Sequence, residues 1–293
     1  MQKKNSVSIN DKIEKFDKNI TVESDKSISH RSLLIASQCI GLSNINNVLE
    51  SDDIRNTIIC LKKLGVKILK KNRKYIVYGN GLGSFKKPKN NFLYAGNSGT
   101  LARMLFPLLG TQSNIKVKIA GDDSLNKRDM KRIIDPLSKI GCNFYPKNKT
   151  TLPLTIEGTG MPLAQKHVER IGSAQVKSAI LLAGLNAPGI TQIEVEKNSR
   201  NHTENLLKAI KADIKIKKLA KSHLISLRGQ KNLFGFNLKI PGDLSSAAPF
   251  IILTLLTANS KLLIKNVNCN KTRIGFINIL KKMNANIKIK NLK

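Results

Sequence analysis

One pattern of hydrophobic and polar positions occurs four times along the chain. Each copy begins with an amphipathic stretch of helical period, ends that stretch at Gly or a small polar residue, and continues into a β-branched strand. In the first copy, Ile54, Ile58 and Leu61 follow the i, i+4, i+7 spacing of one helical face. The four copies lie at 52–68, 129–144, 201–216 and 271–289.

A second, more apolar helix and a strand precede each copy. Two of these helices contain runs with almost no polar face, at 181–185 and 251–256, and a helix that is apolar all round is typically buried. The pattern predicts an α/β fold of repeated βαβαββ units, which pack their buried helices together and turn their sheets outward. An ordinary doubly wound α/β fold is the alternative. The four apolar helices are predicted through 32–37, 101–110, 176–185 and 247–257.

A further hairpin strand follows the first three copies, whereas only residues 287–293 follow the fourth. We expect 287–293 to begin a strand that lacks its partner, because a final strand without a neighbour leaves backbone groups unpaired. We therefore expect the sequence to end inside a unit.

Size and composition narrow the class of protein. A chain of 293 residues that is 41% hydrophobic can bury a sizeable core in one or two domains. Its apolar runs are too short to cross a bilayer, and its basic start leads into no apolar segment, so we expect neither a membrane span nor a secretory signal. The cysteines lie too far apart for metal ligation, which favours core positions in a reducing, cytoplasmic compartment. They are Cys39, Cys60, Cys142 and Cys269.

The formal charge of +32 favours binding to a polyanion. The lysines are nevertheless spread along the chain, and aromatic residues that stack on bases amount to only 4%. We expect no specific nucleic-acid binding, although non-specific binding at low salt follows from the charge alone. A non-catalytic, polyanion-binding protein remains an alternative of a different class.

Four clusters of small, hydroxyl and cationic residues stand out, and most of them open an apolar helix. A helix N-terminus offers unpaired N–H groups and partial positive charge, so phosphates and carboxylates bind there. Four such clusters in one chain predict a site for small, multiply charged anions. They lie at 25–31, 96–100, 122–128 and 173–178.

The clusters and the segments between them resemble the EPSP synthase family, the 3-phosphoshikimate 1-carboxyvinyltransferases. The matching stretches occur in family order. They are DKSISHR (25–31), GNSGT with Arg103 (96–103), GDDSLNKR (121–128), LPLTIEG (152–158), SAQVKSAILLAGL (173–185), SRNHTE (199–204) and PGDLSSAA (241–248). The sister enolpyruvyl transferase that acts on UDP-N-acetylglucosamine is the closest alternative, but it lacks this series.

The resemblance implies a fold of two domains, each made of three βαβαββ units, also described as an inside-out α/β barrel. Residues 21–240 would form one complete domain. Residues 1–20 and 241–293 would belong to a second, incomplete domain, because the resemblance covers about two thirds of the family's length.

The resemblance also implies an activity: transfer of the enolpyruvyl group from phosphoenolpyruvate to the 5-hydroxyl of shikimate 3-phosphate, in the biosynthesis of aromatic amino acids. Members of the family act as monomers, without a metal or an organic cofactor. Their acid and base carboxylates correspond to positions beyond Lys293. We therefore expect negligible turnover from this chain alone.

The resemblance assigns site residues one by one. Lys26 matches a catalytic lysine that touches both substrates, and Asn97 and Thr100 are expected to make supporting contacts. The shikimate 3-phosphate ligands are Lys26, Ser27, Arg31, Ser173, Ala174, Gln175 and Arg200. The phosphoenolpyruvate ligands are Lys26, Gly99, Arg128 and Gln175.

Each assignment has a plainer structural alternative, since cations at a helix start are often solvated and Ser173 is a typical N-cap. His30 and His202 are expected to order neighbouring loops rather than act as bases. Asp122 and Asp123 are expected to steer Lys127 or Arg128 rather than bind a metal.

Two residues depart from the family pattern. Asp129 stands where the family has proline, which predicts a looser loop around Arg128. Pro249 falls early in a predicted helix, where proline is tolerated only in the first turn.

Overall fold

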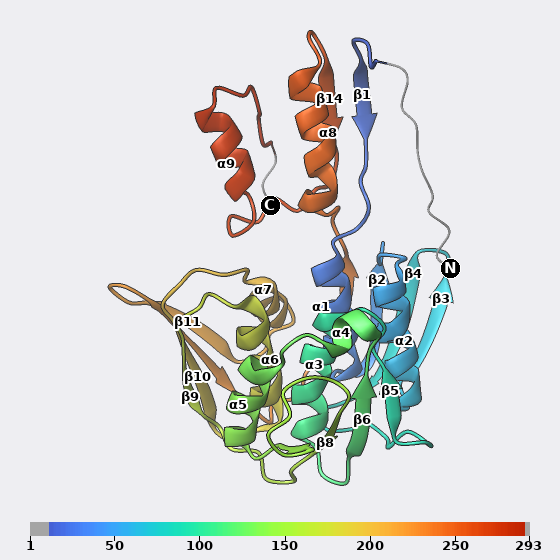
Figure 1. The fold of residues 1–293 in the computed structure, drawn as a ribbon, viewed down its shortest axis with the longest axis vertical. Helices are drawn as coiled ribbons and strands as arrows, with labels where there is room; N and C mark the ends of the chain where they lie inside the picture. Colours follow the sequence, from blue (N-terminus) through green and yellow to red (C-terminus); the bar gives the residue numbers. More distant parts are fainter. Residues whose placement is uncertain (1–11, 291–293) are drawn as a thin grey trace. The chain divides into compact units, whose positions relative to one another are not determined.

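The computed structural model describes residues 12–290. The chain divides into two compact units (Figure 1). One unit is Ser24–Ile240, and the other combines the described parts of Met1–Glu23 and Pro241–Lys293. Because the second unit consists of both ends of the chain, the first is an insertion within it.

Three four-stranded sheets of the same topology make up the β-structure of the unit Ser24–Ile240. In each sheet an edge strand pairs parallel with its neighbour, and the other two pairings are antiparallel. This is the pairing of a βαβαββ unit, as the sequence pattern predicts. The first sheet, in spatial order, is β13 (Asn237–Lys239), β2 (Ile40–Asn46), β4 (Lys74–Asn80) and β3 (Lys67–Lys71). The second is β5 (Phe92–Tyr94), β6 (Lys116–Ala120), β8 (Leu154–Glu157) and β7 (Asn143–Tyr145). The third is β11 (Ile214–Lys218), β12 (His223–Arg228), β10 (Ile190–Val195) and β9 (Lys166–Glu169).

Each sheet is associated with one interior helix and one more exposed helix. Every residue of α6 from Val176 to Asn186 is buried, and α3 packs directly on α6. Figure 1 shows α3 and α6 between the β9/β10 strands and the β5/β6 strands. The predicted arrangement of buried helices and outward sheets is therefore confirmed, and the described strands form separate sheets without closing a barrel. The interior helices are α1 (Lys26–Ser37), α3 (Gly99–Gly110) and α6 (Ala174–Asn186); the others are α2 (Asp52–Lys63), the short α4 (Asp123–Asn126), α5 (Lys131–Ile140) and α7 (His202–Ala209).

The first sheet is completed by a strand from the far end of the unit. In β13, Asn237 pairs with Asn44 and Lys239 pairs with Asn46 of β2. The Nδ2 group of Asn47 also donates to the carbonyl of Ile240 at 2.8 Å. The last strand of the unit thus takes the edge position that β5 and β9 occupy in the other two sheets.

The small residues that end the amphipathic helices have the backbone conformation that the pattern implies. Gly65, Gly141 and Asn284 have φ of +88°, +109° and +63°. This left-handed region is open to glycine at no cost, and asparagine tolerates it better than most residues. In the third copy the left-handed residue is Lys211, at +60°, rather than its neighbour Ala212.

The second unit is smaller. β1 (Asp17–Ile20) pairs parallel with β14 (Lys261–Ile264), and the helices are α8 (Leu244–Leu256) and α9 (Gly275–Lys282). Its fully buried apolar residues are Leu244, Ala247 and Ile277.

The prediction that α8 is buried all round is wrong for the described structure. The side chains of Phe250 and Leu256 are 45% and 81% exposed. Among the residues described for this unit, only a two-stranded sheet and α9 are present to cover the helix, which leaves part of its apolar surface open. Pro249 lies inside α8, and the helix continues past it.

The strand predicted at 287–293 is also absent where the structure describes that segment. Residues 285–290 have no regular β-structure, and 291–293 lie outside the described residues. No described strand pairs with this segment, and a strand without a hydrogen-bonded neighbour is not stable.

Three general features bear on function. No helix within residues 12–290 is long and apolar enough to cross a membrane. All four cysteines are free, and the described residues contain no group of three or more His, Cys, Asp or Glu side chains that could hold a metal ion.

Candidate functional site

The four polar clusters each begin a helix with a side-chain cap, whereas the sequence predicted a helix start for most of them and a cap at Ser173. Asp25 accepts from the N–H of Ile28 at the start of α1, at 3.0 Å. The same contact, from a capping oxygen to the third N–H of the helix, recurs three times. Ser98 caps α3, Asp122 caps α4 and Ser173 caps α6, with distances of 3.2, 2.7 and 3.3 Å.

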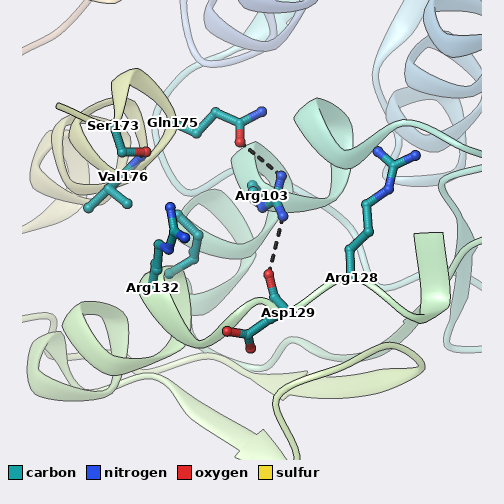
Figure 2. Close-up of a pocket in the computed structure, with 8 residues that line it drawn as sticks. Arg103, Arg128, Asp129, Arg132, Ser173, Gln175 and Val176 are labelled. Carbon is teal, nitrogen blue, oxygen red and sulfur yellow. Dashed lines mark hydrogen bonds between the residues drawn. The ribbon is translucent and has the colours of Figure 1, made fainter. Parts of the chain in front are cut away.

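A pocket of about 360 Å³ lies beside these helix starts, within the unit Ser24–Ile240 (Figure 2). Its wall combines α3, the segment before α5, α5 itself and the start of α6. The lining contains three arginines and one carboxylate, so it carries net positive charge. The lining residues are Arg103, Arg128, Asp129, Arg132, Ile133, Ser173, Gln175 and Val176.

Arg103 holds the centre of the pocket. Its Nη1 donates to Oε1 of Gln175 at 2.8 Å, and its Nη2 donates to the carbonyl of Asp129 at 3.2 Å (Figure 2). Nε2 of Gln175 donates in turn to Oγ1 of Thr100, at 3.3 Å. Both ends of the Gln175 amide are therefore engaged, which fixes the orientation of that amide.

The segment around Asp129 is anchored rather than loosened. The Asp129 carbonyl accepts from Arg103, and its Oδ1 accepts from the N–H of Lys131 at 2.9 Å. That backbone N–H is the main reason why the pKa of the Asp129 carboxyl is lowered. The expectation that aspartate at this position frees the loop is not met, because its side chain forms a local turn that proline could not form.

Arg128 is held by a relay of polar side chains. Its Nη2 donates to Oδ1 of Asn97 at 2.6 Å and to Oγ of Ser124 at 3.3 Å. Nδ2 of Asn97 donates to Oδ2 of Asp122 at 2.7 Å. Asp122 therefore orients Arg128 through Asn97, in agreement with the expectation that this carboxylate steers the arginine.

Gly99 lies directly against two of the arginines. A Cβ added at this position would lie 3.1 Å from Nη1 of Arg103 and 3.4 Å from Nη1 of Arg128. The first distance is tighter than most real Cβ contacts. Glycine therefore leaves room for both guanidinium groups at the start of α3.

The pocket concentrates like charges. Burial is the main cause that lowers the pKa of Arg103, and the charges of Arg128 and Arg132 lower it further, while Asp129 partly opposes them. Guanidinium groups remain protonated under all ordinary conditions. An anion bound among the three would relieve their mutual repulsion and replace lost hydration.

Arg31 lies in the interior rather than on the pocket wall. It is 4% exposed, and three of its nitrogens donate within the protein. Nε donates to Oγ1 of Thr203, Nη1 to the carbonyl of Ser27 and Nη2 to Oγ of Ser178, at 2.8, 2.9 and 3.0 Å. Arg31 thus connects α1 with α6 and α7.

A buried ion pair strengthens the same junction. Nζ of Lys177 lies 2.6 Å from Oε1 of Glu204, and the two side chains are 3% and 2% exposed. Lys177 follows the capped start of α6, and Glu204 lies in the first turn of α7. The pair therefore fixes these two helix starts against each other.

The structure brings together only part of the set assigned by resemblance. Arg128, Ser173 and Gln175 line the pocket, and Gly99 touches its arginines. Lys26 is paired with Asp53 at 3.1 Å, with half of its side chain exposed. The described lining does not include Lys26, Ser27, Arg31, Ala174 or Arg200, of which Arg200 is an exposed residue just before α7.

Two charged pocket residues, Arg103 and Arg132, were given no ligand role from the sequence. Helical spacing was a signal that could have found Arg103, which lies four residues after Gly99 in α3. Residues at i and i+4 of a helix share a face, so a cation at that spacing points to the same region. No such signal marked Arg132, because Arg128 lies in the segment between α4 and α5 and not in a helix.

The chain matches the family described as EPSP synthase (3-phosphoshikimate 1-carboxyvinyltransferase) over residues 10–293. The chain belongs to the EPSP synthase family. This confirms the resemblance drawn from the ordered motifs and favours it over the sister transferase. A similar curated protein, the 3-phosphoshikimate 1-carboxyvinyltransferase of Petrotoga mobilis, is 47% identical over 285 residues, which are 96% of this chain and 64% of that protein. That of Bartonella quintana is 42% identical over 276 residues, covering 93% and 61%.

Solved structures of EPSP synthases have the same fold. The 2.37 Å structure of EPSP synthase from Acinetobacter baumannii matches with a TM-score of 0.86 and 36% identity, covering 95% of this chain and 62% of that one. The α/β fold expected for the family is therefore confirmed. The chain spans about three fifths of the length of the curated relatives it matches.

Proposed function

We propose that the chain serves the reaction for which its relatives are named, the transfer of an enolpyruvyl (1-carboxyvinyl) group from phosphoenolpyruvate to the 5-hydroxyl of shikimate 3-phosphate. This reaction belongs to the shikimate pathway of aromatic amino acid biosynthesis. The observation that carries the proposal is the pocket in which Arg103, Arg128 and Arg132 converge with Ser173 and Gln175.

The chemistry of the substrates suits such a pocket. Each substrate carries a phosphate and a carboxylate, so placing the two side by side requires several cations to offset their repulsion. Guanidinium groups bind carboxylate and phosphate oxygens through two parallel hydrogen bonds, which fixes orientation as well as position. Arg128 is already aimed by the Asn97–Asp122 relay, so little ordering remains to be done on binding.

Two overlapping subsites divide the proposed ligands. Phosphoenolpyruvate lies at the start of α3, beside Lys26, Gly99, Arg128 and Gln175. Shikimate 3-phosphate lies near the starts of α1, α6 and α7. Its ligands are Lys26, Ser27, Arg31, Ser173, Ala174, Gln175 and Arg200.

In the proposed reaction, the CH2 carbon of phosphoenolpyruvate gains a proton to become a methyl group, while the 5-hydroxyl loses its proton and its oxygen bonds to the neighbouring carbon. The tetrahedral adduct then loses phosphate as its C–O bond breaks, and the methyl group gives up a proton, which restores the double bond. The residues described here bind and orient the two anions. Lys26, as the lysine common to both subsites, stabilises charge between them.

We further propose that residues 21–240 act as one substrate-binding domain of a cytoplasmic monomer that needs neither a metal nor an organic cofactor. The four free cysteines support a reducing compartment.

The charge of +32 favours a second candidate, a protein that binds polyanions without turnover. The two functions predict different effects of salt concentration and of single substitutions on binding. Polyanion binding depends on the sum of many cations, whereas a metabolite site depends on a few defined ones.

Isothermal titration calorimetry of the full chain with shikimate 3-phosphate, and then with phosphoenolpyruvate, separates the candidates at about 150 mM salt. We expect saturable binding that weakens about tenfold or more in Lys26→Ala and Arg128→Ala, since each removes a charge-assisted contact. Lys131→Ala is the matched control, because it removes an exposed charge next to the pocket but not from its lining. Equal losses in Arg128→Ala and Lys131→Ala, or binding to nucleic acid alone, would overturn the proposal.

A further inference from the structure

A single buried imidazole connects three helices of the candidate site. His30 on α1 has no exposed surface. Its Nδ1 lies 2.8 Å from Oγ1 of Thr57 on α2, and its Nε2 lies 3.3 Å from Oγ of Ser98, the residue that caps α3. Both ring nitrogens therefore have a hydroxyl partner.

The direction of each hydrogen bond follows from its chemistry. Oγ1 of Thr57 donates to the carbonyl of Asp53 at 3.1 Å, and a carbonyl can only accept. The single hydroxyl hydrogen of Thr57 is thus in use, so Thr57 accepts from Nδ1–H of His30. Burial, followed by the charges of Arg31 and Lys26, lowers the pKa of His30 to about 3, so the ring is neutral. Its Nε2 then accepts from the hydroxyl of Ser98.

The two ends of this chain of hydrogen bonds reach the proposed phosphoenolpyruvate subsite. At one end, Oγ of Ser98 accepts from the N–H of Leu101 and so caps the turn that carries Gly99 and Thr100. At the other end, the side chain of Asp53 pairs with Nζ of Lys26. One turn of α2 thus supports both Lys26 and the start of α3.

We propose that His30 is a positioning residue that fixes the first turn of α3 against α1 and α2, and so sets Gly99 in place relative to Lys26. The inference rests on the proposed function, because that function gives Gly99 and Lys26 their role. His30 is not a base in the reaction, since both of its nitrogens are engaged inside the protein.

Two substitutions separate the two contacts of the ring. In His30→Gln the longer side chain carries its amide near the position of Nε2 and retains a partner for Ser98. In His30→Asn the amide ends near Nδ1, so the partner for Thr57 is retained and that for Ser98 is lost. Ser37→Ala is the matched control for a lost buried hydroxyl, because within residues 12–290 the side chain of Ser37 bonds only with residues 34 and 38 of the same helix end.

The first measurement reads the imidazole directly. The full chain is labelled with ¹⁵N-histidine, and the signals of His30 are assigned among the four histidines by their loss in His30→Gln. We expect a protonated Nδ1 and an unprotonated Nε2, unchanged between about pH 5.5 and 8.5. The opposite tautomer, or a charged ring in that range, would overturn the inference.

The second measurement reads the subsite. With shikimate 3-phosphate bound, His30→Asn and Ser98→Ala should each weaken phosphoenolpyruvate binding about three- to tenfold, whereas His30→Gln and Ser37→Ala should change it less than about twofold. Because His30 acts through Ser98, the double variant His30→Asn with Ser98→Ala should bind no more weakly than the weaker single variant. Additive losses, or equal losses in His30→Gln and His30→Asn, would contradict the inference.

A chain that binds neither substrate would refute the proposed function. The positioning role of His30 would then be tested without a ligand. Amide hydrogen exchange at Leu101 then decides. Faster exchange in His30→Asn than in His30→Gln supports the positioning role, and equal exchange in the two variants overturns it.

Discussion

The helices α6 and α8 begin in similar ways but differ in their surroundings. Each has 13 residues, a polar cap, Ser173 or Asp243, and an almost wholly apolar second half. All residues of α6 from Val176 onward are buried, whereas in α8 only Leu244 and Ala247 are. The apolar sequences of α6 and α8 both predict an interior helix. Only α6 is buried, because other helices pack around it.

The ion pairs of the two units differ in how many donors their carboxylates have. Lys177 and Glu204 are both almost fully buried, and their contact joins two helices. Arg273 and Asp243 lie 2.9 Å apart, but Asp243 also accepts from the N–H of Ser245, at 2.8 Å. The first carboxylate depends heavily on its lysine, and the second has a further donor from its own helix start.

Lys177→Ala should have the largest effect on stability. It leaves the carboxylate of Glu204 buried without its cation, which typically costs about 3–5 kcal/mol. Urea unfolding followed by tyrosine fluorescence measures this loss in the unit Ser24–Ile240, because the chain has no tryptophan and all four tyrosines lie in that unit.

Arg273→Ala is the comparison in the other unit. It should cost only about 1–2 kcal/mol by circular dichroism, since Asp243 retains the backbone N–H of Ser245. An equal loss in the two variants would show that the additional N–H donor to Asp243 has no energetic consequence.

Leu181→Ala in α6 should lower the free energy of unfolding by about 3 kcal/mol, because it opens a cavity among packed helices. Leu256→Ala in α8, where the side chain is 81% exposed, should change it by less than about 0.5 kcal/mol. Urea unfolding followed by circular dichroism measures both. A large loss in Leu256→Ala would mean that α8 is covered in solution.

The buried imidazole predicts an acid sensitivity specific to the unit Ser24–Ile240. The folded pKa of His30 is about 3, below its ordinary value of 6.5, so below pH 6.5 the unfolded chain binds a proton that the folded chain does not. Its contribution is complete above pH 6.5 and is lost as the pH falls toward 3, with a slope of up to about 1.4 kcal/mol per pH unit.

The comparison of wild type with His30→Gln isolates this contribution. Between pH 6.5 and pH 5, wild type should lose about 2 kcal/mol more than the variant in urea unfolding followed by tyrosine fluorescence. Parallel pH profiles for the two proteins would show that His30 is not neutral in the fold.

Arg132→Ala should have the smallest effect, on binding rather than on folding. It removes one of three pocket cations and should weaken shikimate 3-phosphate or phosphoenolpyruvate binding about three- to tenfold. Lys131→Ala removes the same charge from the neighbouring position of α5 outside the lining, so calorimetry should show less than a twofold change. A similar loss of affinity in Arg132→Ala and Lys131→Ala would show that the effect comes from the overall charge of the protein.

The helix caps and the repeated helix and strand periods were predictable, because they depend on residues that are close together in the sequence. The caps at Asp25, Ser98, Asp122 and Ser173 depend on a side chain and an N–H three residues away. The helix and strand periods of the repeat are likewise visible within a short window. The motifs also identified the family, because the order in which they occur along the chain is specific even where each motif alone is not.

Features that depend on distant residues were not predictable in this way. The pairing of Asn237 with Asn44 brings together positions far apart in the chain, and no periodicity encodes it. Arg31 matched a substrate ligand, but its guanidinium is engaged by Thr203 and Ser178, which the motif alone could not show. The exposure of α8 depends on which elements surround it rather than on its own sequence.

The N–H of Asp243 donates to the carbonyl of Glu23 at 2.7 Å, so more than two hundred intervening residues leave and rejoin the smaller unit at a single point. Were that insertion unstructured, holding its ends together would cost about 5 kcal/mol in chain entropy. Once folded, it presents both ends ready to be joined. We therefore expect the smaller unit to form at a lower entropic cost once the large one has folded, so that β1, which precedes the large unit in the chain, pairs with β14 only after it.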